Sequence, residues 1–106
     1  MMNDINNEYK VIISEQAKDM LIQHMRFLAD VNLQAADDLR IKIMKDSESL
    51  RYLPKRNPFI YDVLFPANKY RKMVINERYL MIYQIKDDIV YIDYILDCRQ
   101  NYNWLL

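Results

Sequence analysis

Apolar positions in the first half of the chain recur with helical spacing, after one short stretch in which they alternate. Alternation over residues 8–13 predicts a strand, because successive side chains of a strand point to opposite faces. Ser14 then offers a helix N-cap, and the apolar spacing that follows predicts a helix over about 15–30. The predicted buried stripe of this helix consists of Ala17, Leu21, His24 and Leu28, widened by Met20 and Phe27.

A second helical pattern begins after a predicted turn at residues 30–32. It predicts a helix from about residue 33 to residue 53, because Pro54 cannot continue the hydrogen bonding of a helix. Two helices joined by so few residues form an antiparallel hairpin. The apolar stripe of the second helix consists of Leu33, Ala36, Leu39, Ile43 and Leu50.

Beyond Pro54 the apolar residues change to a period of two and are rich in Tyr, Ile, Val and Met, which predicts strands. Turns rich in Asn and Asp at 76–78 and 86–88 join neighbouring strands as antiparallel hairpins. A terminal helical turn anchored by Trp104 and Leu105 follows. The predicted strands cover residues 59–65, 69–75, 79–85 and 89–96.

We therefore expect one α+β domain over residues 1–106. It contains one strand, an antiparallel two-helix hairpin and a three- to four-stranded antiparallel meander. The helices cover one face of the sheet, because both have an apolar stripe to bury. The other face is then open or covered by a partner chain.

Alternation also assigns strand residues to faces. The predicted core set is Leu80, Ile82, Val90, Ile92 and Leu96. The opposite set, Tyr79, Tyr83 and Tyr91, is predicted to face outward near Arg71. Tyrosine rings beside a guanidinium suit either RNA or a partner protein, because they stack on bases and are enriched at protein interfaces.

The chain contains no glycine, which excludes several common sites. A P-loop, a dinucleotide-binding loop and a nucleophile elbow each need backbone that only glycine adopts readily. One histidine and one cysteine cannot form a Cys/His zinc site, so we expect no metal or cofactor. His24 lies in the apolar stripe of its helix, where a packing role is the more common one.

Basic and acidic residues are equal in number, fifteen of each, so the chain has no overall cationic field. Residues 55–86, however, hold seven basic residues against two acidic ones. This segment is either a solvated sheet edge or a binding surface. The single cysteine, Cys98, allows no intramolecular disulfide, and no signal peptide or membrane span is predicted. We expect a soluble, cytoplasmic protein.

Motifs in the C-terminal half resemble those of the RelE/ParE superfamily of toxins from bacterial type II toxin–antitoxin systems. They are a strand that begins Tyr70-Arg71, an aromatic-ended strand over 78–83, and a last strand at 90–92 that runs into an "R…Y" tail at 97–102. Residues 9–14 and the Leu53-Pro54 pair also fit, so the resemblance spans about residues 8–105.

The resemblance implies a toxin that is neutralised by a cognate antitoxin. RelE-like members are ribosome-dependent, metal-independent mRNA endonucleases that inhibit translation. ParE-like members are not enzymes and inhibit DNA gyrase instead. An endoribonuclease is the first interpretation, and a gyrase inhibitor or an inactive binding protein with the toxin fold is the alternative.

The resemblance also implies roles for individual residues. Arg71, Arg99 and Tyr102 match the family's catalytic positions, and an RNase would need the three side chains to converge on one exposed site. Asn101 stands where some relatives have a histidine base. The residues expected to bind RNA are Lys55, Arg56, Lys69, Arg78 and Tyr83.

Overall fold

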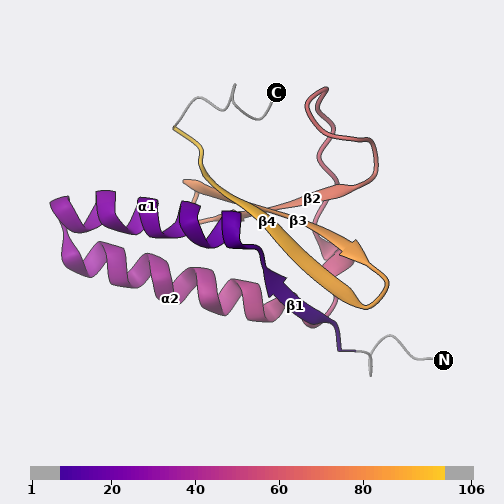
Figure 1. Ribbon diagram of the computed structural model, residues 1–106, viewed down its shortest axis with the longest axis horizontal. Helices are drawn as coiled ribbons and strands as arrows, with labels where there is room; N and C mark the ends of the chain where they lie inside the picture. The colour runs from indigo at the N-terminus through magenta and orange to yellow at the C-terminus, as the bar shows by residue number, and fades with distance from the viewer. Residues whose placement is uncertain (1–7, 100–106) are drawn as a thin grey trace.

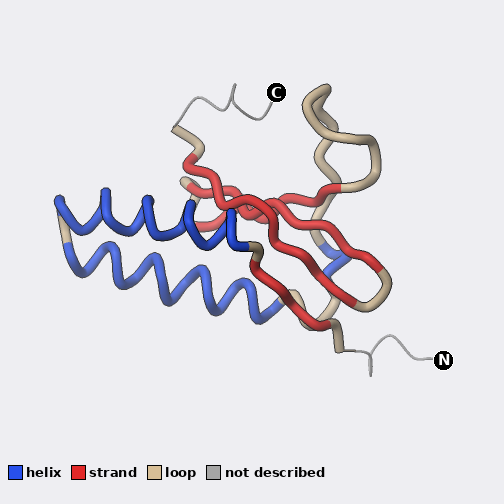
Figure 2. Tube along the Cα trace, in the orientation of Figure 1, coloured by secondary structure: helices blue, strands red, loops and turns tan. Residues whose placement is uncertain are grey.

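The computed structural model describes residues 8–99. Within this range one sheet carries a helical hairpin on one side (Figure 1; Figure 2). The strand order is β1-β4-β3-β2, with β1 parallel to β4 and the other neighbours antiparallel. The predicted α+β architecture is confirmed. The elements are β1 (Lys10–Ile13), α1 (Glu15–Val31), α2 (Leu33–Ser49), the short 3-10 helix η2 (Pro54–Arg56), β2 (Tyr70–Ile75), β3 (Tyr79–Lys86) and β4 (Ile89–Asp97).

Side-chain caps set the helix boundaries. The Ser14 hydroxyl accepts a hydrogen bond from the Ala17 amide at 3.0 Å and so begins α1, as the sequence predicted. Asn32 both ends α1 and begins α2, since its amide donates to the Leu28 carbonyl and its side chain accepts from the Ala35 amide. The predicted three-residue turn is therefore reduced to one residue.

The helical hairpin projects beyond the sheet at its α1–α2 connection (Figure 1). Ala17, Leu21 and His24 are buried as predicted. Phe27 and Leu33 were predicted to be in the stripe but are 62% and 76% exposed, because they lie near the projecting end. The apolar stripes of α1 and α2 thus continue toward the α1–α2 connection, beyond the part of the hairpin that the sheet covers.

β3 turns its tyrosines toward the helices. Tyr79, Met81 and Tyr83 are buried in the main core, and Tyr83 has no exposed surface. The prediction that Tyr79 and Tyr83 face outward is wrong. Leu80 and Ile82, predicted to face the helices, belong to a second apolar cluster on the other side of the sheet. Because both faces of β3 are covered, alternation alone could not tell which one the helices occupy.

A β-bulge at Asp93 changes the face assignment along β4. Ile82 pairs with Tyr94 and Tyr83 pairs with Ile92, which leaves Asp93 as an extra residue on β4. Ile92 and Ile95 consequently both reach the main core, where Val90 also lies. Leu96 lies in the second cluster, so the predicted grouping of Leu96 with Val90 and Ile92 is wrong.

The predicted strand over 59–65 is also wrong. Apart from one isolated bridge between Phe59 and Arg71, the segment forms turns and irregular backbone. Ile60 and Phe65 pack into the second apolar cluster, whereas Val63 is 99% exposed. The segment is therefore held by the side chains of Ile60 and Phe65 and does not bury every second residue as a strand would. It covers part of the sheet face that was predicted to be open or occupied by a partner.

The strand turns rely on left-handed backbone without glycine. Asn76, Glu77 and Asp87 have φ values of 52°, 60° and 57°. Asn and Asp tolerate this conformation better than other residues that carry a Cβ. The predicted tail turn with Trp104 and Leu105 lies outside the described residues. Among those that are described, no helix is long and apolar enough to cross a membrane.

We predict that Tyr83→Phe lowers the free energy of unfolding by about 1–2 kcal/mol, because a buried acceptor loses its donor. The Tyr83 hydroxyl donates to the Pro54 carbonyl at 2.6 Å and accepts from the side-chain Nδ2 of Asn57 at 3.0 Å. Urea denaturation measures the change. Tyr61→Phe is the matched control, since Tyr61 is 79% exposed; equal stability of the two variants would contradict the role assigned to the Tyr83 hydroxyl.

Candidate functional site

The predicted site residues lie at two ends of the sheet. On β3, Tyr83 is the register partner of Arg71 and Tyr79 is the partner of Asp97, two residues before Arg99. Tyr79 and Tyr83 are four positions apart along β3, which corresponds to roughly 13 Å. The structure therefore does not bring Arg71 and Arg99 together. Tyr102 lies outside the described residues.

One end of the sheet holds a pocket of about 390 Å³, which we call the basic pocket. Three predicted site residues, Lys55, Lys69 and Arg71, line it together. Asp87 is the one carboxylate among the described residues lining it, so basic side chains outnumber acidic ones there. Its lining is completed by Phe59, Asn68 and Ile85.

Arg71 organises the wall of the basic pocket. Its Nη1 donates to the carbonyl oxygens of Asn57 at 2.7 Å and Lys55 at 3.1 Å. Its guanidinium lies 3.9 Å from the centre of the Phe59 ring, a cation–π contact. Arg71 is half-buried, not the freely exposed side chain that the sequence predicted. It fixes η2 and the residue that follows it, and it lines the pocket.

Two further residues that were predicted to bind RNA have structural contacts instead. Arg56 donates to the Ser49, Tyr52 and Leu53 carbonyls, so its charge caps the C-terminal end of α2. Tyr83 is fully buried, and its ring cannot stack on a base. Burial raises the pKa of its hydroxyl. Lys55 and Lys69 remain exposed at the basic pocket.

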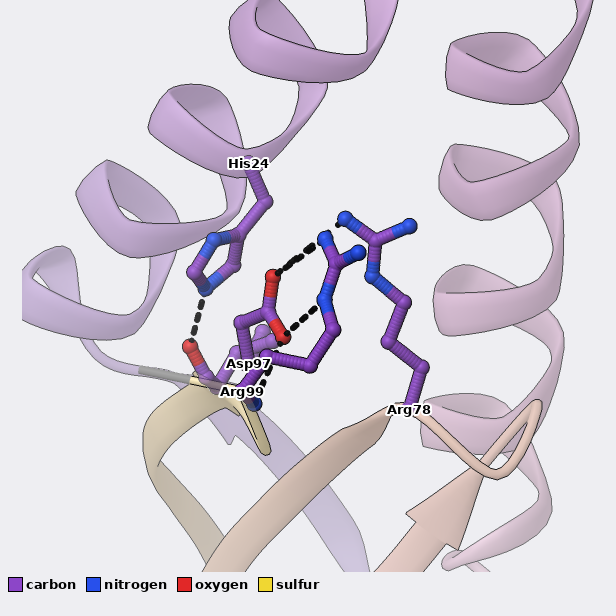
Figure 3. Close-up of polar contacts among 5 residues, drawn as sticks. His24, Arg78, Asp97 and Arg99 are labelled. Carbon is purple, nitrogen blue, oxygen red and sulfur yellow. Dashed lines mark hydrogen bonds and ion pairs between the residues drawn. The ribbon is translucent and has the colours of Figure 1, made fainter. Parts of the chain in front are cut away.

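The other end of the sheet holds a cluster centred on Asp97 (Figure 3). This carboxylate is 4% exposed, and Arg78 and Arg99 both bind its Oδ2, at 3.4 and 3.3 Å. The backbone amide and Nε of Arg99 donate to Oδ1 at 3.0 and 3.3 Å. Arg78 is the last residue of the β2–β3 turn and Arg99 follows β4, so Asp97 ties this turn to the segment that leaves β4.

His24 reaches the same cluster from α1. Its Nε2 donates to the Ile95 carbonyl at 2.7 Å, which places the ring proton on that nitrogen. The ring also lies 5.4 Å from the Tyr79 ring. Burial raises the pKa of the Tyr79 hydroxyl, and the positive charge of Arg78 opposes that shift.

A cavity of about 460 Å³ opens beside these side chains, and we call it the Asp97 cavity. The sequence placed Arg78 and Arg99 among the site residues, put Tyr79 near Arg71 when it is in fact the register partner of Asp97, and gave no site role to Asp97. One signal in the sequence could have indicated this cluster. Arg78 directly precedes β3 and Arg99 closely follows β4, and the antiparallel pairing of these two strands brings both arginines to the same end of the sheet. The cavity is lined by Gln23, His24, Phe27, Tyr79, Asp97 and Arg99.

The two sites differ in what they can do. The basic pocket presents cationic N–H groups that suit a phosphodiester, and Asp87 is the one carboxylate among the described lining residues that could accept a ribose proton. The Asp97 cavity has a histidine, but its Nε2 is held by a backbone carbonyl. Across residues 8–99 no cluster of His, Cys, Asp or Glu is suited to a metal ion.

The fold is similar to that of a chain from the chromosomal ParDE toxin–antitoxin system of P. aeruginosa. The TM-score is 0.70, and the match covers 87% of this chain and 98% of that chain, with 10% sequence identity. No family model and no curated protein matches the sequence. At this identity the comparison shows the fold alone, and it confirms the RelE/ParE-like architecture that the motifs predicted.

We predict that Asp97→Asn lowers the free energy of unfolding by about 1–3 kcal/mol, because the half-buried Arg78 and the exposed Arg99 lose the charge of a buried carboxylate that both bind. Thermal or urea unfolding measures the effect. Asp37→Asn is the matched control, since Asp37 pairs with Arg40 on the exposed face of α2 and such pairs contribute about 0–1 kcal/mol. A loss no larger than that of the control would contradict the structural role of Asp97.

Proposed function

We propose that this chain is the toxin component of a toxin–antitoxin pair and is neutralised by a cognate antitoxin. The observation that carries the proposal is the arrangement of β1, the helical hairpin and the meander, which matches nearly the whole length of a chain from a ParDE system. The RelE/ParE-like motifs on β2 and β3 support the same conclusion. Both candidate targets are cytoplasmic, so we propose that the protein acts there.

Within that role we propose that the toxin acts by binding DNA gyrase rather than by cutting RNA. An RNase of the predicted kind needs Arg71 and Arg99 around one phosphate, where both would stabilise the developing charge. Instead, these residues lie at opposite ends of the sheet. Each is also held by a structural partner: Arg71 by the Lys55 and Asn57 carbonyls, and Arg99 by Asp97.

Cleavage of ribosome-bound mRNA is the second candidate. The observation that favours it is the basic pocket, where Lys55, Lys69 and Arg71 converge beside the Phe59 ring. These groups match the charge and shape of a phosphodiester with an adjoining base. In this alternative the chemistry takes place at the basic pocket, and Arg99 has no part in it.

The projecting end of the helical hairpin supports the antitoxin partner. Ile22, Met25 and Leu33 line an open apolar groove of about 350 Å³ between α1 and α2. Val31 lies close by in sequence and is 79% exposed. An exposed apolar groove favours a protein partner, because apolar surface is costly to leave in contact with water. We propose that the antitoxin covers it.

Induced expression of the chain without an antitoxin tests the proposal, with pulse labelling of DNA and protein synthesis in one culture. We predict growth arrest in which DNA synthesis falls first. The Lys55→Ala/Lys69→Ala double variant should arrest growth equally well, as should a Lys18→Ala/Lys42→Ala control on the helix surfaces.

The other outcomes are distinct. An early fall in protein synthesis that only the Lys55→Ala/Lys69→Ala variant abolishes would establish the RNase alternative. Normal growth in every culture, with the protein folded and abundant, would contradict the toxin assignment itself.

A further inference from the structure

The irregular segment between η2 and β2 carries the most exposed large apolar side chain of the described residues. Val63 is 99% exposed, and Tyr61, two positions earlier, is 79% exposed. We call residues 61–64 the projecting loop. Irregular segments as long as 57–69 are uncommon inside a compact domain and usually have a function. Neither the apolar groove between α1 and α2 nor the basic pocket includes a residue of this loop.

The projecting loop lies away from the surface that we assign to the antitoxin. Figure 1 shows the segment before β2 and the α1–α2 connection projecting from opposite sides of the molecule. The apolar groove lies between the two helices, where Ile22, Met25 and Leu33 line it. A partner confined to that groove therefore leaves the projecting loop accessible to a second partner.

Both ends of the projecting loop are fixed to the sheet. Ile60 precedes it, is 8% exposed, and donates its amide hydrogen to the Tyr70 carbonyl at 2.8 Å. Phe65 follows it and packs its ring 5.6 Å from the Tyr70 ring and 6.4 Å from the Tyr94 ring, between ring centres. The loop is therefore held at its base by packing against β2 and β4.

Asp62 sets the turn inside the projecting loop. Its Oδ1 accepts a hydrogen bond from the Leu64 amide at 3.0 Å, and its carbonyl oxygen accepts one from the Phe65 amide at 3.1 Å. Aspartate commonly forms such turns through its own side chain. Tyr61 and Val63 stand on either side of Asp62, so the turn presents both to solvent. A loop that is already ordered loses little conformational entropy when it binds.

The shape of the projecting loop determines the kind of partner that fits it. The groove between α1 and α2 is concave, and a peptide segment binds by lying in such a groove. A projecting loop instead needs a concave apolar site on a folded partner, where its side chains lose contact with water. Of the two protein partners of the proposed toxin, the antitoxin has the groove, and gyrase is a folded enzyme.

From these observations we propose that the projecting loop is the surface through which this chain binds DNA gyrase. Val63 and Tyr61 enter a concave apolar site of the enzyme, and the Asp62 turn holds them in position. The proposal rests on the proposed gyrase function and names the surface that performs it.

Supercoiling by purified DNA gyrase, titrated with the purified full-length chain, tests the proposal. The Tyr61→Ser/Val63→Ser double variant should raise the concentration needed for half-inhibition by roughly tenfold or more, because it removes both apolar contacts. Both side chains are exposed, so urea denaturation should show unchanged stability. Val31→Ser/Leu33→Ser is the matched control, since these residues are 79% and 76% exposed at the antitoxin surface and should leave inhibition unchanged.

A second pair of variants tests the turn. Asp62→Ala should weaken inhibition about threefold, because the Leu64 amide loses its acceptor and the loop is less ordered before binding. Asp62→Asn should retain full inhibition, since its amide oxygen accepts the same hydrogen bond. An equal loss in both variants would contradict the positioning role of Asp62.

The outcomes distinguish this proposal from the function on which it rests. If the unaltered chain leaves supercoiling unimpaired, the gyrase function fails and the loop assignment fails with it. If the unaltered chain inhibits gyrase and Tyr61→Ser/Val63→Ser inhibits it equally well, only the loop assignment is overturned. An equal loss in the loop variant and in Val31→Ser/Leu33→Ser would also overturn it.

Discussion

The side chains that β3 turns toward the helical hairpin determine the rest of the structure. Tyr79, Met81 and Tyr83 form this row and are buried beneath α1 and α2. β3 lies between β2 and β4, so its orientation sets the face that both neighbours present. Through its hydroxyl, Tyr83 also fixes the Pro54 carbonyl and the Asn57 side chain. The core thereby positions the segment that forms one wall of the basic pocket.

The two arginines that the sequence predicted to act together lie toward the two ends of the sheet. Arg71 lies at one end with Lys55 and Lys69, and Arg99 lies at the other with Asp97. Catalysis of RNA cleavage without a metal concentrates cationic groups around a single phosphate. A division into two separate sites, together with exposed apolar surface on the hairpin, suits a protein that acts by binding.

Local signals in the sequence predicted most elements. Ser14 marks the start of α1, and β2, β3 and β4 begin and end within one residue of their predicted bounds. The faces of β3 were not predictable, because both are apolar and both are covered. The bulge at Asp93 has no sequence signature, and it reverses the alternation along β4. The contacts that build the two sites were not predictable either. His24 meets Ile95, and Arg71 meets Asn57, only through tertiary packing of segments that are distant in the sequence.

The central claim is that this RelE/ParE-like fold, in which Arg71 and Arg99 lie apart, acts by binding. A supercoiling assay with purified DNA gyrase tests it most directly. The account predicts that the purified chain inhibits supercoiling, and that this inhibition survives Arg99→Gln. Unimpaired supercoiling, together with cleavage of ribosome-bound mRNA by the same preparation, would contradict it and assign the chemistry to the basic pocket.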